Sequence, residues 1–204
     1  MTESVDVSKI RHIMFLGIDA GELLLYVPYD GTTDVNHDMR AALLRAIMQF
    51  SEDSLSMIRW SNFIYMFHKG ETAIGLMGMS SVPDQEIYRD KLVKILHAFE
   101  KECRTPLRAQ DGDIRRFKNF ALEIIRELPL INLSLDSVPR RTEGGERIPW
   151  RVGEVDVSLE ILQQASNGTR TIQEIIDMTQ MPARDVIALL SILAYFGWIE
   201  IDWF

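Results

Sequence analysis

Short apolar runs alternate with helix-spaced apolar positions along the first 128 residues. Two nearly continuous apolar runs, 10–16 and 23–29, flank the segment Gly17-Ile18-Asp19-Ala20-Gly21. Glycines and an aspartate between two such runs predict a hairpin turn. Because neither run alternates regularly with polar residues, we expect two strands that are buried on both faces.

The apolar spacing then becomes helical and afterwards strand-like again. An amphipathic helix of about three turns is predicted from Met39, Leu43, Ile47 and Phe50. Three further apolar runs follow, at 55–60, 63–68 and 72–79. The connectors between these runs are short, so we predict antiparallel hairpin neighbours.

Two more helices are predicted before residue 129. Ser81, Pro83 and Asp84 form a helix-start pattern. One apolar stripe follows it, at Tyr88, Leu92, Ile95, Leu96 and Phe99. A second stripe, ended by Pro129, contains Ile114, Phe117, Ala121, Ile124, Ile125 and Leu128. This order predicts an α+β domain over residues 1–128, a five-stranded antiparallel sheet with helices on both faces.

The remaining residues predict a linker and a small helical domain. Residues 129–150 are rich in polar residues, proline and glycine, which is typical of a linker. In residues 151–204, Val157, Ile161 and Leu162 indicate a short helix, and Thr171 with Glu174 forms a capping box. Pro182 opens a third helix, Gly197 ends it, and the final residues alternate like a strand.

Composition and charge narrow the function classes. The 204 residues are 47% hydrophobic with a net charge of −8, which is ordinary for a globular protein but unfavourable for generic phosphate binding. A single cysteine, Cys103, excludes a disulfide framework and a cysteine-built metal site within one chain. The acidic N-terminus and the absence of a long apolar run lead us to expect a cytoplasmic protein without a membrane span.

No catalytic or metal motif is present in the sequence. The turn at 17–21 lacks the lysine of a phosphate-binding loop, and the four histidines are scattered without metal-ligand spacing. Nor does Gly78-Met79-Ser80-Ser81 form a serine nucleophile elbow. We therefore expect no enzyme activity, no catalytic residue, no metal and no cofactor.

The order and length of elements over residues 8–128 resemble a longin domain, a fold related to the roadblock family. This resemblance implies a non-enzymatic domain that forms homodimers and binds small GTPases or trafficking partners. In that family the third strand lies at a sheet edge beside the first helix, where a second copy would extend the sheet. The implied dimer and partner interface consists of Met39, Leu43, Ile47, Leu55, Met57, Arg59 and Trp60.

Residues 155–203 resemble a winged-helix domain. The resemblance rests on the segment 168–175, on Met181-Pro182, and on the segment 193–199. Only one clear strand follows the last helix, so the wing is shortened. With the first domain, this order is similar to archaeal-type proteins associated with small GTPases. Trp198, Trp203 and Phe204 are candidates for a C-terminal interface, either with a partner or with the chain's own core.

Winged helices bind DNA or protein, and charge favours protein here. A recognition helix in the major groove needs outward basic or amide side chains, and the helix from Pro182 to Phe196 offers Arg184. From Pro149 onward there are three arginines and eight acidic residues. DNA is therefore an unlikely partner on electrostatic grounds.

The sequence thus predicts an adaptor or regulator of a small GTPase, and two alternatives stay open. One is a winged-helix transcription regulator whose N-terminal domain acts as a sensor. The other is a ligand sensor with a small molecule between sheet and helix, although no residue specifies that molecule.

Overall fold

The protein folds as two compact α+β units, residues Met1–Phe117 and Lys118–Phe204. The structure is a computed structural model, and it describes residues 5–19, 21–30, 57–60, 63–80, 85–104, 107, 114–150 and 153–202. The first unit therefore ends eleven residues before the boundary expected at residue 128.

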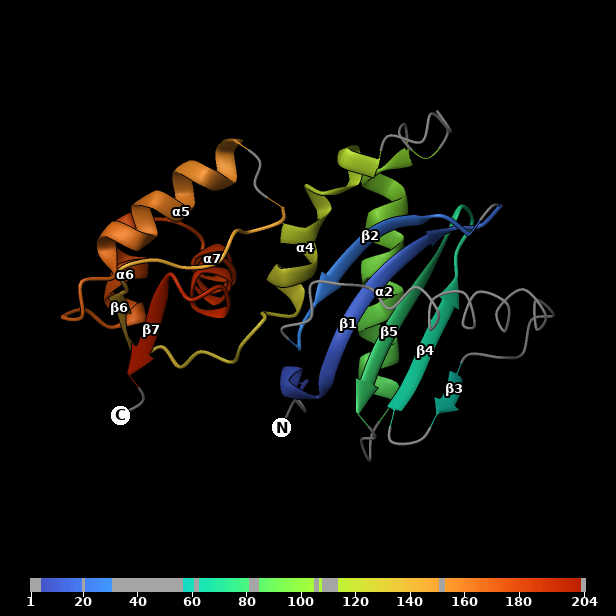
Figure 1. Ribbon diagram of the computed structural model, residues 1–204, viewed down its shortest axis with the longest axis horizontal. Helices are drawn as coiled ribbons and strands as arrows, with labels where there is room; N and C mark the ends of the chain where they lie inside the picture. Colours follow the sequence, from blue (N-terminus) through green and yellow to red (C-terminus); the bar gives the residue numbers. More distant parts are fainter. Residues whose placement is uncertain are drawn as a thin grey trace. The chain divides into compact units, whose positions relative to one another are not determined.

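A five-stranded antiparallel sheet forms the first unit, which confirms that part of the predicted fold. Its strands are β1 (Ile10–Gly17), β2 (Leu23–Pro28), β3 (Met57–Trp60), β4 (Phe63–Lys69) and β5 (Ala73–Ser80). The order across the sheet is β2-β1-β5-β4-β3 (Figure 1). β1 and β5 are therefore central strands, whereas β2 and β3 lie at the edges.

The turn between β1 and β2 has the predicted glycine chemistry. Gly21 has φ +65°, a conformation that costs a glycine little because it has no Cβ. The backbone N–H of Gly17 donates to the carbonyl of Glu22 at 2.9 Å, which closes the hairpin. A local sequence signal was sufficient here because the turn depends on a few adjacent residues.

Both faces of the central strands are buried, as their uninterrupted apolar runs predicted. On one face lies α2 (Glu86–Glu102), whose buried residues are the five of the predicted stripe (Figure 1). Phe15 of β1 stacks on Phe99 of α2 with ring centroids 4.4 Å apart. The opposite face holds a second buried cluster of Met14, Leu16, Tyr65, Phe67, Ile74 and Leu76. The helix predicted at 39–50 lies outside the described residues.

The predicted single helix over 114–128 is two pieces in the structure. A 3-10 helix, η2 (Ile114–Phe117), is followed by the α-helix α4 (Phe120–Glu127). Phe117 packs on Phe99 in the first unit, with centroids 5.6 Å apart, whereas α4 packs on a helix of the second unit. Continuous apolar spacing could not reveal that the two pieces have different packing partners.

In the second unit, helices surround a central one. Besides α4, its elements are β6 (Val138–Arg141), α5 (Gly153–Ala165), α6 (Ile172–Thr179), α7 (Ala183–Tyr195) and β7 (Ile199–Asp202). α7 contacts α4, α5, α6 and β7, and its residues from Ala188 to Leu193 are all buried. α7 is therefore the core of this unit.

The helix ends in this unit follow the predicted capping chemistry. Thr171 and Glu174 form the reciprocal capping box at the start of α6. Gln180 ends α6 with φ 56°, and Pro182 precedes α7. Gly197 has φ +74° just after α7, a left-handed position that favours glycine. These features confirm the three helices expected in the last third of the chain.

The segment 129–150, predicted as a linker, lies within the second unit. Val138–Arg141 forms β6, which pairs antiparallel with β7. The carbonyls of Leu135 and Ser137 accept hydrogen bonds from the first N–H groups of α6, at 3.0 and 2.9 Å. Polar composition suggested a free chain, but the backbone hydrogen bonds of this segment are made with residues distant in sequence, which composition does not encode.

The carboxylate of Glu100 offers a test of how α2 holds the sheet. Its Oε1 accepts from the backbone N–H of Thr72 at 2.6 Å and of Ala73 at 3.0 Å, where β5 begins. Glu100→Ala should lower the free energy of unfolding by about 1 to 2 kcal/mol, because two backbone donors lose a charged acceptor. Urea unfolding measures this change. Lys101→Ala, on the same helical turn, is the control, and equal effects of the two variants would contradict the anchoring role.

Candidate functional site

The structure describes four of the ten residues predicted to form interfaces. Met57, Arg59 and Trp60 form most of the edge strand β3, and Trp198 follows α7. The other six lie outside the described residues: Met39, Leu43, Ile47, Leu55, Trp203 and Phe204. Two candidate surfaces therefore remain, the β3 edge in the first unit and the surroundings of Trp198 in the second.

At the sheet edge, β3 has β4 as its strand neighbour. The pairing runs from Met57 opposite Met66 to Trp60 opposite Phe63. Met57 and Ile58 are half-buried, Arg59 is exposed, and Phe63 is 43% exposed. An edge strand leaves one row of backbone N–H and C=O groups available, so β3 can accept another strand by backbone pairing.

Trp198 is held in a defined orientation beside the end of α7. Its indole Nε1 donates to the carbonyl of Glu146 at 2.8 Å, and its backbone N–H donates to the carbonyl of Leu193 at 2.8 Å. Gly145 makes room for the ring, since a Cβ at that position would lie 2.7 Å from the Trp198 Cγ. The side chain is half-buried, so it packs on its own unit and also reaches the surface.

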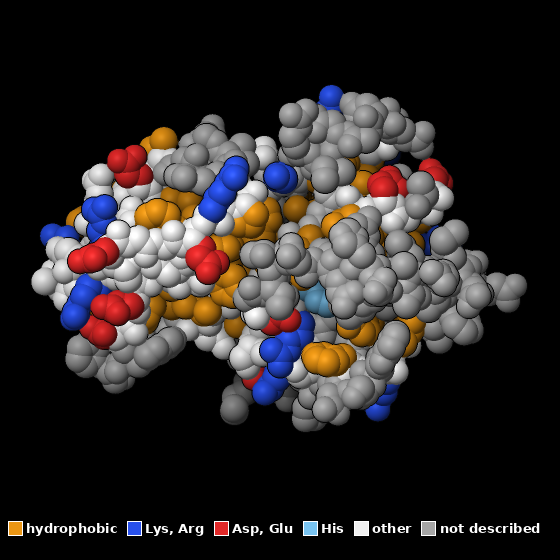
Figure 2. Space-filling model, viewed as in Figure 1, with side chains coloured by type: hydrophobic (Ala, Val, Ile, Leu, Met, Phe, Trp, Pro, Cys, Tyr) orange, Lys and Arg blue, Asp and Glu red, His pale blue; other side chains and the backbone are white. Residues whose placement is uncertain are grey.

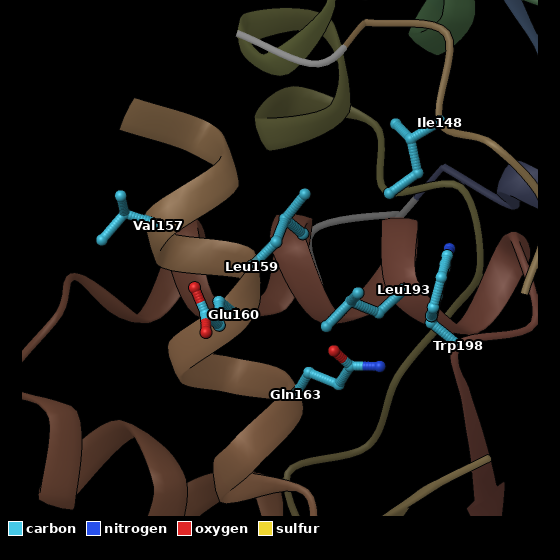
Figure 3. A pocket seen from close by; sticks show the side chains of 7 residues that line it. All are labelled: Ile148, Val157, Leu159, Glu160, Gln163, Leu193 and Trp198. Carbon is cyan, nitrogen blue, oxygen red and sulfur yellow. The ribbon is translucent and has the colours of Figure 1, made fainter. Parts of the chain in front are cut away.

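A pocket of about 310 Å³ lies beside Trp198. It is lined by Ile148, Val157, Leu159, Glu160, Gln163, Leu193 and Trp198. Figure 3 shows Leu159 and Gln163 on the side of α5 that faces Leu193 and Trp198, whereas Val157 points from the opposite side of the helix. The lining therefore mixes apolar side chains with a carboxylate and an amide that both come from one helix.

The surface of α5 next to this pocket is unusually apolar. Val157 is 60% exposed and Ile161 is 46% exposed, although the sequence pattern had grouped both with the buried Leu162. The helix instead buries Leu159, Leu162 and Ala165. Figure 2 shows hydrophobic side chains reaching the surface between charged ones. The pocket and this exposed pair form one candidate binding surface.

Sequence reasoning identified Trp198 but missed Ile148, Glu160 and Gln163. Ile148 lies in the segment interpreted as a linker, and the two polar residues looked like ordinary solvent-facing positions of α5. Their contribution depends on α5, α7 and the preceding segment meeting in space, for which the sequence contains no local signal.

His12 is the described histidine with the most perturbed environment. It lies between Tyr26 and Tyr65, with ring centroids 5.8 Å from each, and its Nε2 is buried without a hydrogen-bond partner. Gly78 is its cross-strand partner, and a Cβ at Gly78 would approach the imidazole to 2.5 Å. Burial lowers the pKa of His12 from 6.5 to about 4, so the imidazole is neutral at neutral pH.

Cys103, the single cysteine of the chain, is buried. Burial raises the pKa of Cys103 to about 11, so this thiol stays protonated near neutral pH. Among the described residues, no three His, Cys, Asp or Glu side chains are grouped so that they could bind a metal ion. None of the described helices is both long and apolar enough to cross a membrane.

Comparison with known proteins leaves the family open. No protein-family model matches the chain, and no curated protein matches it. The resemblance to longin and winged-helix domains thus stays a prediction from the sequence.

The buried imidazole of His12 predicts a pH-dependent stability. The folded state favours neutral His12, while in the unfolded chain the imidazole binds a proton below pH 6.5. Its contribution to stability is therefore complete above that pH and is lost as the pH falls towards 4. The loss should amount to about 3 kcal/mol.

Urea unfolding of the wild type and of His12→Gln over this pH range measures the effect. The variant should show a weaker dependence on pH, because the carboxylates common to both proteins cancel in the comparison. Parallel pH profiles for the two proteins would contradict the assigned role of His12.

Proposed function

We propose that this chain is a non-catalytic adaptor or regulator that binds a small GTPase. In this proposal the first unit is a longin-like homodimer, and the second is a winged-helix-like module that binds protein. The burial of α7 favours protein over DNA as the partner of the second unit. The identification of a small GTPase as the partner of the chain rests on the resemblance of residues 8–128 to longin domains.

The burial of α7 supports protein binding over DNA binding. A recognition helix must present one face to the major groove, but α7 is packed by α4, α5, α6 and β7. Of its residues, Ala183 and Arg184 are exposed. Arg184 also lies 3.6 Å from the Asp185 carboxylate, which reduces the positive charge it can offer to a phosphate.

The order of elements supports the winged-helix part of the proposal. Three helices are followed by β7, whose partner β6 precedes them in sequence. β6 also forms a bridge through Arg140 to Asn167, between α5 and α6. The pairing of β6 with β7 supports this part of the proposal because it gives the three helices a small sheet.

The edge position of β3 supports dimerisation by strand pairing. A second copy could pair antiparallel along β3 and continue the sheet across the two subunits. Met57, Arg59 and Trp60 would then lie at the dimer interface. The regulator's effect on its GTPase, whether activation, exchange or tethering, is a separate question.

A transcription regulator is the second candidate, because a three-helix unit with a small sheet is also found in DNA-binding proteins. A gel shift with random-sequence duplex DNA at low salt separates the two. We expect no shift, since the acidic second unit repels phosphates. Salt-sensitive binding that Arg184→Ala abolishes would favour the transcription regulator.

The dimer interface predicts that Met57→Lys and Met57→Pro each yield monomers. Lysine places a charge in the strand-to-strand contact, and proline removes a backbone donor and stiffens the chain. Light scattering measures the mass, and circular dichroism checks that each variant is folded. Glu71→Lys, at the exposed turn between β4 and β5, should leave the dimer intact. An unchanged mass for both Met57 variants would refute this interface.

A pull-down from native lysate tests the partner. The wild-type protein should enrich small GTPases over a bead control, and the recovered GTPase should bind again as a purified protein. Failure of purified GTPases to bind would refute this part of the proposal.

A further inference from the structure

The pocket beside Trp198 combines apolar side chains with the carboxylate of Glu160, which has no cationic partner among the described residues. Ile148, Leu193 and the fixed indole of Trp198 supply apolar surface on one side. Glu160 lines the same pocket from α5 and is exposed. No described residue forms a salt bridge with Glu160, and its side-chain contact is the amide of Gln164 at 3.5 Å.

Acidic residues outnumber basic residues in the sequence of α5. The sequence of α5 contains three acidic residues and no basic one. Arg147 adjoins the pocket wall in sequence but forms no ion pair with Glu160. The exposed carboxylate of Glu160 therefore makes the described lining of the pocket complementary to positive charge.

We propose that this surface binds a protein segment that presents a lysine or arginine next to a large hydrophobic side chain. The hydrophobic side chain enters between Leu193 and Trp198, and its neighbouring cation pairs with Glu160. The exposed Val157 and Ile161 contact further apolar residues of the same segment. This inference rests on the proposed role of the second unit as a protein-binding module, and it names the chemistry of the partner.

The extent of the surface favours a chain segment over a small amine. A small ligand would fill the pocket and leave the exposed Ile161 uncovered, whereas a peptide can cover the pocket and Ile161 together. Charge disfavours a second copy of this protein, because a symmetric contact would bring two acidic α5 helices together.

Selection from a random-peptide display library on the full-length protein tests the proposal. Enriched peptides should contain Lys or Arg close to an aliphatic or aromatic residue. Their affinity, measured by fluorescence anisotropy, should fall about tenfold or more for Glu160→Lys. Ile161→Ser should also weaken binding, because the surface loses apolar contact area. Circular dichroism should report a wild-type fold for both variants, since each residue is exposed.

Two controls distinguish a binding role from a general charge effect. Asp177→Lys makes the same charge change on α6, outside the pocket, and should leave peptide affinity unchanged. Selection on Glu160→Lys should enrich peptides with an acidic residue in place of the basic one, an exchange that a merely structural role would not produce.

Four results would contradict the proposed peptide-binding surface. The proposal is wrong if no peptide is enriched, if the enriched peptides lack basic residues, or if Glu160→Lys and Asp177→Lys behave alike. It is also wrong if Ile161→Ser changes the mass of the protein instead of peptide affinity, which would assign the surface to self-association. Each of these results leaves the GTPase pull-down and the DNA gel shift unaffected, so failure here is distinguishable from failure of the proposed function.

Discussion

The second unit depends on backbone hydrogen bonds between the segment before α5 and the residues that follow α7. Peptide groups that leave water must find partners, and here β6 finds them in β7 and next to Asn167. Further along, the N–H of Glu146 donates to the carbonyl of Phe196 at 2.7 Å, while its carbonyl accepts from the indole of Trp198. These contacts set Ile148 and Trp198 beside α7 and so create the pocket.

The first unit depends on a different constraint, because both faces of its central strands are buried. β1 and β5 have neighbours on each side, so their backbone groups are paired within the sheet. Among the described strands β2 and β3 each have one such neighbour, and β3 is the edge at which strand addition is proposed. The buried His12 belongs to the central region, where its neutral state fits an apolar environment. His12 thus affects the stability of the fold, whereas the edge strand β3 is the proposed site of homodimer assembly.

Charge and burial together favour protein recognition as the proposed role of the second unit. α7 is enclosed by its neighbours, while α5 keeps Val157, Glu160 and Ile161 at the surface. An acidic apolar surface repels nucleic acid and suits a basic amphipathic segment. The helix that resembles a DNA reader in sequence is therefore a core element, and the neighbouring helix carries the exposed apolar residues of the proposed binding surface.

The sequence by itself determined the local elements. The apolar stripe of α2, the glycine turn between β1 and β2, and the capping box of α6 follow from interactions within a few residues of each other. The tertiary structure alone decided which apolar positions of α5 face inward, since Val157 and Ile161 share helical spacing with the residues it buries. It also decided that the polar segment around β6 pairs with β7 and that Glu160 meets Trp198 across a pocket. Those contacts join residues far apart in the chain, and no local periodicity encodes them.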